Sequence, residues 1–225
     1  MPRKKTFAVI GIGNFGTAVI KTLISKKQDV YVYDKDKTTL TNTIDTFENL
    51  EGAAIDTTFK NNLIEHGFKE FDTVIVTMSS NIEAGILTII GLQDIGVKNI
   101  IAKGKDDRHV KILNAIGITN IVQPDAFSGK MTATKAMYGL EADIQSMDDK
   151  YASIIIKVSE PSINGKNLTD IGLINNKMYN IIKVTRKGKT ILPADLDKLE
   201  FDDEVLFISQ IDQITKLINL LTIEK

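Results

Sequence analysis

The chain has 225 residues, of which 43% are apolar and 25% charged, so it can bury the core of one large domain or of two small ones. A formal net charge of −1 gives no basis for bulk nucleic-acid binding, and a sequence without cysteine excludes disulfides, thiolate metal sites and cysteine nucleophiles. No signal peptide is expected, because the basic start has no long apolar core and leads into a glycine-rich strand and turn. No membrane span is expected, because Gln93, Asp94 and Lys98 interrupt the most apolar region.

Short apolar runs alternate with segments of helical periodicity through the first half of the chain. Runs that are apolar on both faces are typical of strands in a parallel sheet with helices on both sides. The sequence therefore predicts an α/β fold with a Rossmann-like, doubly wound parallel sheet. Six strands are expected at 6–12, 29–34, 51–55, 72–78, 99–104 and 120–124, with helices at 14–25, 37–46, 61–66, 82–95 and 107–116.

The pattern changes near residue 127. Residues 128–147 are predicted to form a single amphipathic helix with no strand directly after it. The remaining chain has β signals and a last helical segment, which together predict a small α+β domain. Its expected elements are strands at 151–158 and 203–209, a pair of strands joined around Lys187 and Gly188, and a helix at 211–222.

A glycine-rich turn, Gly11, Gly13 and Gly16 in the pattern G-x-G-x-x-G, follows the first predicted strand and opens a helix. In this context the first glycine permits a tight turn, the second lets backbone approach a pyrophosphate, and the third lets helix pack on strand. Asp34 ends the second strand, where a carboxylate can hold both ribose hydroxyls and would repel the 2′-phosphate of NADP. The pattern predicts an adenine-nucleotide site.

Polar residues follow the other strands at their carboxyl ends, where doubly wound sheets bind ligands. Helix capping is an equally good interpretation of Thr57, and Lys103 is either a solvated lysine or a charge over the phosphates. Ser79 follows the fourth strand beside two of the candidates. The predicted cofactor-binding residues are Gly11, Gly13, Asn14, Phe15, Gly16, Asp34, Lys35, Asp56, Thr57, Thr58, Thr77, Met78, Asn81 and Lys103.

The acid–base group and second-substrate pocket of a hydride-transfer enzyme are not evident. Of the two histidines, His66 is expected to cap a helix C-terminus and His109 to lie structurally at a helix start. The sequence thus favours a binding protein over an NAD-dependent oxidoreductase, which stays the main alternative. An NADH-sensing DNA-binding repressor is a third possibility, although no helix-turn-helix or basic face is visible.

Several segments together resemble one known family. "FAVIGIGNFGTAVIKTL", "NNLIEHGFKEFDTVIVTMSSNIEAGILT" and "IGITNIVQPD" are similar to its nucleotide-binding half, and "NGKNL", "RKGKTILP" and "FDDEVLFI" to its C-terminal module. The family comprises the regulatory RCK-domain subunits of the Trk/Ktr potassium-uptake systems, of KtrA or TrkA type. The resemblance implies a nucleotide-binding RCK N-terminal domain at 1–126, a crossover helix or linker at 127–150, and an RCK C-terminal domain for ligand sensing and dimerisation at 151–225.

The resemblance further implies that the protein is a gating subunit and not an enzyme. Such subunits form homodimers that assemble into a homo-octameric ring beneath a membrane-embedded potassium channel subunit of KtrB or TrkH type. ATP or ADP, or NAD or NADH in some members, binds at the glycine loop and changes the shape of the ring. We therefore expect a soluble, cytoplasmic protein, peripheral on the inner face of the cell membrane through its channel partner and without a nucleic-acid partner.

The family's functional residues transfer to matching positions of this chain. The three glycines match the phosphate loop, and Asp34 matches the ribose carboxylate. Asp125 falls where relatives often carry a glutamate that helps to bind a divalent cation such as Mg²⁺. Asp56 and Thr58 match the base-side turn, and Asn81 and Lys103 match polar positions around the nucleotide.

Two positions depart from the family pattern. Asn14 stands where several Ktr-type relatives have an arginine that reaches the terminal phosphate, and an amide cannot supply that charge-assisted contact. Discrimination between ATP and ADP therefore stays open. Ile174 stands where members that bind cyclic di-AMP tend to have an arginine. The residues assigned to cyclic di-AMP by resemblance are Ile174, Asn180, Ile181 and Pro193.

Overall fold

A computed structural model describes residues 4–48, 50–78, 80–138, 143–147, 150–174 and 176–223. The chain divides into two compact units, Met1–Ala126 and Phe127–Lys225, and each has its own hydrophobic core. Among the described residues, no helix combines the length and the apolar character needed to cross a membrane.

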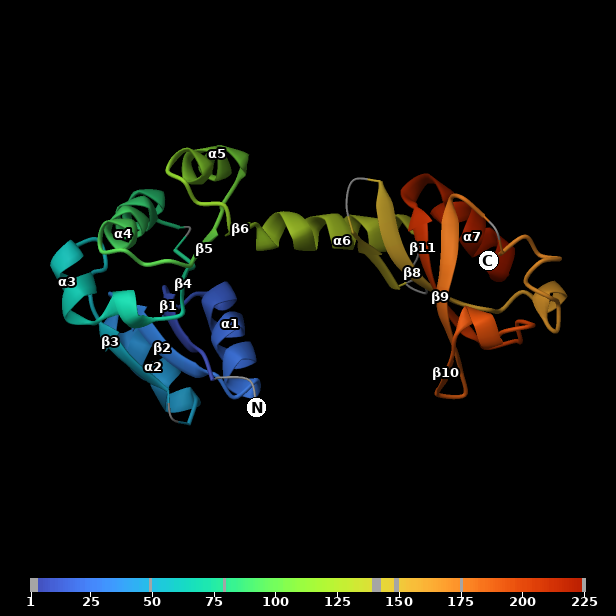
Figure 1. Ribbon diagram of the computed structural model, residues 1–225, viewed down its shortest axis with the longest axis horizontal. Helices are drawn as coiled ribbons and strands as arrows, with labels where there is room; N and C mark the ends of the chain where they lie inside the picture. Colours follow the sequence, from blue (N-terminus) through green and yellow to red (C-terminus); the bar gives the residue numbers. More distant parts are fainter. Residues whose placement is uncertain are drawn as a thin grey trace. The chain divides into compact units, whose positions relative to one another are not determined.

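The first unit is built on a parallel sheet of six strands in the order β3-β2-β1-β4-β5-β6 (Figure 1). The order reverses between β1 and β4, which is the switch point where doubly wound sheets open a crevice for a ligand. The predicted doubly wound sheet is thus confirmed. The strands are β1 (Thr6–Ile10), β2 (Asp29–Asp34), β3 (Glu51–Ala54), β4 (Thr73–Val76), β5 (Ile100–Lys103) and β6 (Ile121–Val122).

Helices cover both faces of this sheet. Alternate residues of β1 supply the two cores, since Val9 faces one side while Ala8 and Ile10 face the other. On the Val9 side lie α1 (Asn14–Ser25) and α2 (Lys37–Thr46). On the other side lie α3 (Lys60–Glu65), α4 (Ile82–Asp94) and α5 (Asp107–Ala115). The strands are therefore continuous apolar runs because both of their faces are buried.

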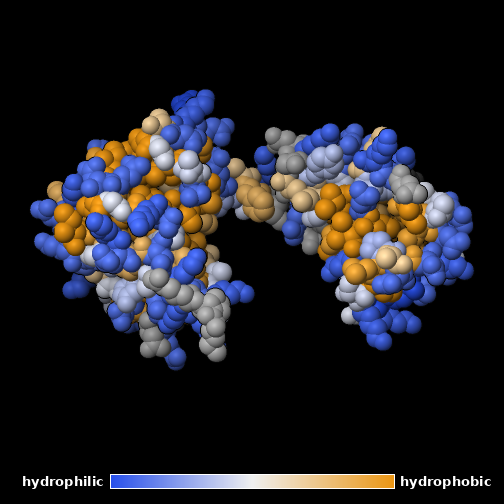
Figure 2. Space-filling view, viewed as in Figure 1, coloured by the Kyte–Doolittle hydropathy of each residue, from blue (hydrophilic) through white to orange (hydrophobic). Residues whose placement is uncertain are grey.

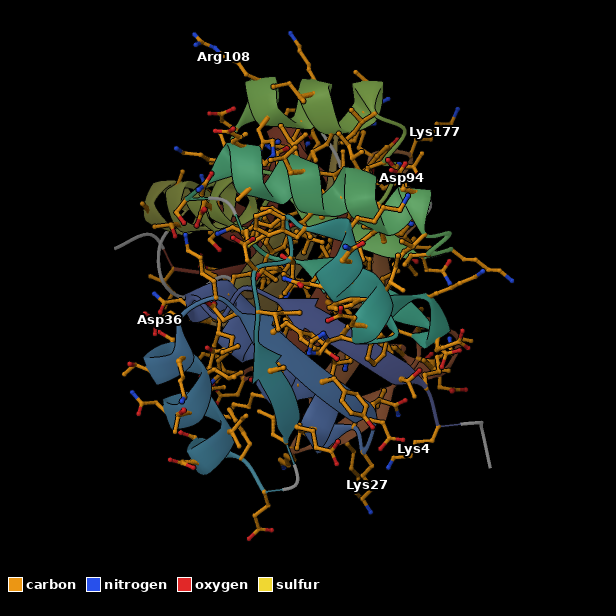
Figure 3. The ribbon with its side chains drawn as sticks, turned by 90° about the vertical axis from the view of Figure 1, so that its left-hand side faces the viewer. Lys4, Lys27, Asp36, Asp94, Arg108 and Lys177 are labelled. Carbon is orange, nitrogen blue, oxygen red and sulfur yellow. The ribbon has the colours of Figure 1, made fainter. Side chains whose placement is uncertain are left out.

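Three of these helices begin with a side-chain cap. Asp36, labelled in Figure 3, accepts a hydrogen bond from the backbone N–H of Thr39 at the start of α2. Asn81 caps α4 and Asp106 caps α5 in the same way. The backbone hydrogen bond lowers the pKa of the Asp36 carboxyl, because it favours the ionised form. These caps fix where each helix leaves the carboxyl-end edge of the sheet.

The second unit contains an antiparallel sheet in the order β10-β9-β11-β8-β7. Its inward side chains, such as Ile154 and Phe207, pack with Ile214 and Leu217 of a C-terminal helix. Figure 2 shows hydrophilic residues around hydrophobic ones on the visible face of this unit. The elements are α6 (Pro124–Tyr138), which begins in the first unit, then β7 (Asp143–Ser146), β8 (Tyr151–Lys157), β9 (Tyr179–Arg186), β10 (Lys189–Ile191), β11 (Glu204–Gln210) and α7 (Ile214–Leu221).

The single helix predicted at 128–147 is wrong in both length and position. α6 begins earlier, at Pro124, and ends at Tyr138, while residues 139–142 lie outside the described part. Within the predicted helix, β7 pairs with β8 so that Ile144 lies opposite Ile154, and both side chains are fully buried. Because β7 has only this one buried apolar residue, its four residues carry too little alternation to distinguish a strand from a helix end.

An ion pair stabilises the second unit beside its sheet. Both oxygens of the Asp203 carboxylate, which is fully buried, accept hydrogen bonds at 2.8 Å from the Arg186 guanidinium. Arg186 also donates to Glu200 and to the carbonyl of Lys198. The hydrogen bonds to Asp203 raise the pKa of Arg186. The guanidinium thus ties the end of β9 to the chain that enters β11.

We expect Arg186→Leu to lower the free energy of unfolding by about 3 kcal/mol, because it leaves the buried Asp203 carboxylate without its cation. Chemical denaturation of the full chain, followed by circular dichroism, measures this change. Lys157→Met is the matched control, since it breaks a pair with Asp202 in which both side chains are more than half exposed. An equal loss in both variants would contradict the special role of the buried pair.

Candidate nucleotide site

A cavity of about 750 Å³ lies at the carboxyl-end edge of the first unit's sheet. It is lined by residues at or just after the ends of β1 to β5 and by the first turns of α1 and α4. All fourteen predicted cofactor-binding residues line it, and so does Asp125. Residues spread over 115 positions of sequence are thus brought to one place, from Gly11 to Asp125.

The glycine turn is held by close backbone contacts. Gly11 has a φ of +93°, a left-handed value that favours glycine. A Cβ on Gly16 would lie 2.3 Å from the carbonyl oxygen of Gly11, so no side chain fits where α1 crosses the end of β1. The buried hydroxyl of Thr77 donates to the same oxygen at 2.6 Å. Thr77 therefore braces the turn from β4.

Gly13 has a different environment. A Cβ built on it meets no atom within 4 Å, so the protein itself leaves open the space above this residue. Gly13 is the N-cap of α1, and no side chain caps this helix. The first N–H groups of a 12-residue helix therefore face the cavity, with no acidic residue in the first turn. This arrangement fits a phosphate group.

Asp34 lies beside this turn at the end of β2. Its carboxylate accepts hydrogen bonds from the backbone N–H of Ile12 at 2.8 Å and from that of Asp36 at 2.9 Å. Each oxygen makes one of these bonds, so each keeps acceptor capacity for a further donor. The position and remaining acceptors suit the two hydroxyls of a ribose.

The neighbouring residues Thr57 and Thr58, in the turn after β3, have different hydrogen-bond partners. The carboxylate of Asp56 accepts hydrogen bonds from the hydroxyl of Thr58 at 2.6 Å and from its backbone N–H, and these bonds lower the pKa of Asp56. Thr57 is buried, and its hydroxyl lies 2.9 Å from that of Thr88 on α4. This contact supports a packing role for Thr57, whereas Asp56 and Thr58 present polar atoms at the cavity rim.

Beyond β4 the chain passes Met78 and enters α4 at its cap. Met78 is half-buried, and its Cγ is the atom that a Cβ on Gly11 would meet. The Asn81 side-chain oxygen accepts from the N–H of Ala84, so this residue both caps α4 and lines the cavity. Ser79 lies outside the described residues.

Lys103, at the end of β5, is the less exposed of the two lysines that line the cavity. Its side chain is only 14% exposed, and its Nζ lies 3.5 Å from an oxygen of Asp125 and 5.7 Å from the centre of the Phe15 ring. Asp125 is 80% exposed and belongs to the first turn of α6, one residue after Pro124. The Lys103 ammonium therefore lies beside the first turn of α1, to which Phe15 belongs.

Sequence reasoning missed several residues that line the cavity. Glu83 and Leu87 lie on the exposed side of α4 one turn apart, and Ile55 and Thr39 lie near the ribose end. The i, i+4 spacing of Glu83 and Leu87, directly after the Asn81 cap, is a signal that could have identified both. Ile55 stands one residue before Asp56, and Thr39 lies inside α2. No motif identifies either residue.

The histidines have structural roles. His66 is the C-cap of α3, and its Nδ1 donates to the carbonyl of Asn62 at 3.0 Å. His109 is buried at the start of α5, where its Nδ1 accepts from the backbone N–H of Lys105. Burial lowers the pKa of His109, which favours the neutral ring.

No group of three or more His, Cys, Asp or Glu side chains forms a metal site within the described residues. Mg²⁺ that enters with a nucleotide takes most of its ligands from phosphates and water, with one or two carboxylates from the protein. Asp125 fits that limited role, since it is exposed at the cavity wall.

The residues assigned to cyclic di-AMP lie in the second unit. Asn180 and Ile181 are consecutive on β9, so their side chains point to opposite faces of the sheet. Ile181 packs on the core, whereas Asn180 is exposed. Ile174 and Pro193 are also exposed, in the segments before β9 and after β10. The structure does not bring the Asn180 and Ile181 side chains to one surface.

Comparison with known proteins extends over the whole chain. The TrkA-N domain family matches residues 7–124. The chain is 28% identical over 216 residues to Ktr system potassium uptake protein C of Bacillus subtilis, covering 95% of this chain and 96% of that one. It is 25% identical over 220 residues to Ktr system potassium uptake protein A of the same organism, covering 96% and 97%.

Solved structures share the fold. The GsuK channel bound to NAD matches all of this chain with a TM-score of 0.63 and 15% identity, although the chain spans only 40% of its length. GsuK bound to ADP matches 61% of the chain, and 36% of its own length, with a TM-score of 0.52 and 14% identity. The chain thus spans less than half of the length of both structures.

Two glycine substitutions should separate folding from binding. We expect Gly16→Ala to lower the free energy of unfolding by about 2 kcal/mol, because its Cβ collides with the Gly11 carbonyl. We expect Gly13→Asp to leave stability unchanged or to raise it by up to about 1 kcal/mol, since aspartate is a good N-cap. Denaturant unfolding of both variants measures these changes.

Gly13→Asp should nevertheless abolish nucleotide binding. Its carboxylate would occupy the open space above α1, accept from the helix N–H groups and repel the phosphates. Calorimetric titration with ATP and ADP tests this loss, and retained affinity would show that the phosphates bind elsewhere.

Proposed function

The chain belongs to the TrkA-N domain family, and we propose on that premise that it is a nucleotide-binding regulatory subunit of a Ktr-type potassium uptake system. One observation carries the nucleotide part of the proposal. The uncapped N-terminus of α1, the open space at Gly13 and the Asp34 carboxylate line one cavity. This set suits the phosphates and ribose of an adenine nucleotide.

The ligand is proposed to be ATP or ADP, with NAD or NADH as the alternative. Solved structures of the same fold are described as bound to NAD and to ADP, which supports the class of ligand. Asp34 disfavours nucleotides with a 2′-phosphate on the ribose. Mg²⁺ would enter with the nucleotide and meet Asp125 at the cavity wall.

Regulation follows from thermodynamic linkage. A bound nucleotide shifts the equilibrium between two conformations only by the difference in its affinity for them. We infer that this chain forms homodimers and a homo-octameric ring on a membrane-embedded potassium channel subunit. The ring would lie at the cytoplasmic face of the membrane, and its shape would control ion flow.

The chain is not an enzyme. The curated relatives that it matches nearly end to end are potassium uptake proteins, and its two histidines are engaged in helix structure. The oxidoreductase alternative would require turnover of NADH with a carbonyl substrate. The DNA-binding repressor alternative would require binding to DNA that weakens steeply with salt.

Cyclic di-AMP is a second proposed ligand, assigned by family resemblance to Ile174, Asn180, Ile181 and Pro193. Of these residues, Asn180 offers an exposed amide, and Ile174 and Pro193 offer exposed apolar surface. The side chain of Ile181 belongs to the core, so this residue would contribute only its backbone. The absence of heat at a large excess of cyclic di-AMP would refute this part of the proposal alone.

Calorimetric titration of the full chain tests the proposed function. We expect ATP and ADP to bind the wild-type protein and to produce no heat with Gly13→Asp, the matched variant that blocks only the phosphate space. NADPH should bind more weakly than NADH, because Asp34 repels the extra phosphate. Tight binding of NADH without any response to ATP or ADP would select the dinucleotide alternative, and only turnover of NADH with a carbonyl substrate would favour the oxidoreductase.

A further inference from the structure

We propose that His109 is a proton-sensitive positioning residue: its neutral ring holds the turn between β5 and α5, residues 104–106, and protonation of the ring at Nδ1 releases this turn. Because the turn directly follows Lys103, its release would disturb the wall of the nucleotide cavity. The effect on nucleotide binding rests on the proposed function, whereas the switch itself can be measured without any ligand.

His109 is a buried histidine in a segment that is otherwise charged and exposed. Only 2% of its surface is accessible, although residues 105–108 directly before it are all exposed. Figure 3 shows the side chain of the neighbouring Arg108 pointing away from the fold. The start of α5 thus places one titratable ring inside the protein and leaves its charged neighbours in water.

Two hydrogen bonds join His109 to the turn before it. The Asp106 carboxylate accepts from the backbone N–H of His109 at 2.9 Å, and Nδ1 of His109 accepts from the backbone N–H of Lys105 at 3.2 Å. This is a variant of the capping box, in which the third helical residue accepts from the chain before the helix. A backbone N–H can only donate, so Nδ1 carries no proton and the neutral ring has its proton on Nε2.

The other ring nitrogen of His109 is an unsatisfied donor. Nε2 is buried, and within the described part of the chain no atom accepts its hydrogen bond. An apolar side chain of similar size would avoid this cost, so the position holds an ionisable ring at the expense of stability. The protonated ring would have a donor at each nitrogen and would direct Nδ1–H at the N–H of Lys105. Two donors cannot bond, so the ring and the turn would separate.

The surroundings of the ring favour its neutral form. Burial lowers the pKa of His109, Asp106 opposes this effect, and Lys105 adds to it. Because the pKa is lower in the folded protein than in the unfolded chain, the stability that the neutral ring contributes is complete above about pH 6.5. It is lost as the pH falls through the lowered pKa. The switch therefore responds to acid.

The other charged groups around α5 are exposed or paired elsewhere. On α5 itself, Asp107 and Lys111 are exposed. Of the elements beside it, β5 contributes Lys103, which pairs with Asp125 from the chain after β6. On α4, Asp94 pairs with Lys60 and Glu83 is exposed. The immediate electrostatic partners of the ring are therefore the two residues of its own turn, Asp106 and Lys105.

The turn can transmit the change because it is tightly packed. A Cβ on Gly104 would lie 2.7 Å from Cγ2 of Val110 and 3.1 Å from Cγ2 of Ile121. The N–H of Gly104 also donates to the carbonyl of Val122 at 2.8 Å. The backbone at this point has no free space, so its displacement shifts the end of β5 or the start of α5. Lys103, one residue before Gly104, lines the cavity and would move with it.

The first test measures the ring and the turn in the full chain without ligand. Nitrogen NMR of labelled histidine should show a ring protonated at Nε2 at about pH 7.5 and a pKa for His109 below about 6.5. Hydrogen exchange at the Lys105 amide should be at least about tenfold faster in His109→Leu, which fills the space but cannot accept. His109→Asn should keep the slow exchange, because its side-chain oxygen takes the place of Nδ1 and does not titrate.

The second test measures the coupling to the cavity. ADP is titrated by calorimetry between about pH 8 and about pH 5.5. As the pH falls, the wild-type protein should lose affinity relative to His109→Asn by about fivefold or more, because only the wild-type ring gains a proton. The ratio of the two affinities cancels the protonation of ADP itself. His66→Gln is the matched control, since it removes the other histidine of the sequence, and it should keep the wild-type pH profile.

A proton on Nδ1 at neutral pH, or a pKa for His109 at or above its usual value, would overturn the inference. An unchanged exchange rate at Lys105 in His109→Leu would do the same. An affinity ratio that stays constant with pH would overturn the coupling to the cavity. The NMR measurement needs no variant, so it decides the state of the ring even if a substitution prevents folding. Failure of the wild-type chain to bind any adenine nucleotide at neutral pH would instead refute the proposed function and leave the ring measurements intact.

Discussion

The contact between Gly16 and the Gly11 carbonyl is the constraint on which the first unit's site depends. Because Gly16 has no Cβ, α1 can begin directly over the end of β1 and direct its first N–H groups into the cavity. Thr77 holds the same carbonyl from β4, the strand at the switch point of the sheet. Asp34, on the other side, binds the N–H of Ile12 within the turn. Three neighbouring strands thus fix one short loop.

Much of the first unit could be predicted from sequence because its signals are local. Helices α1 and α2 and strand β2 have the predicted bounds, since the apolar runs are continuous and caps such as Asp36 mark the helix starts. The glycine pattern and the residues after each strand lie at one cavity because parallel strands end at the same edge. Nucleotide binding by these residues stays a prediction.

Other features depend on contacts distant in sequence, and sequence reasoning could not supply them. The residues of β7 resemble the end of a helix in sequence, because only their pairing with β8 shows that Ile144 belongs to a sheet core. The partner of Thr57 is Thr88, 31 positions away, so packing and ligand contact could not be distinguished beforehand. By contrast, the opposite faces of Asn180 and Ile181 follow from local strand geometry alone.

The hydrogen bonds of Asp34 have a kinetic consequence. The carboxylate already accepts hydrogen bonds from the N–H groups of Ile12 and Asp36, so Asp34 and the glycine turn are positioned before any ligand arrives. Association then needs no ordering of the loop, and its rate is set by diffusion and electrostatic steering. Differences in affinity among nucleotides consequently appear as differences in residence time. A regulatory subunit of the proposed kind would register a change in the nucleotide pool on the timescale at which the previous ligand dissociates.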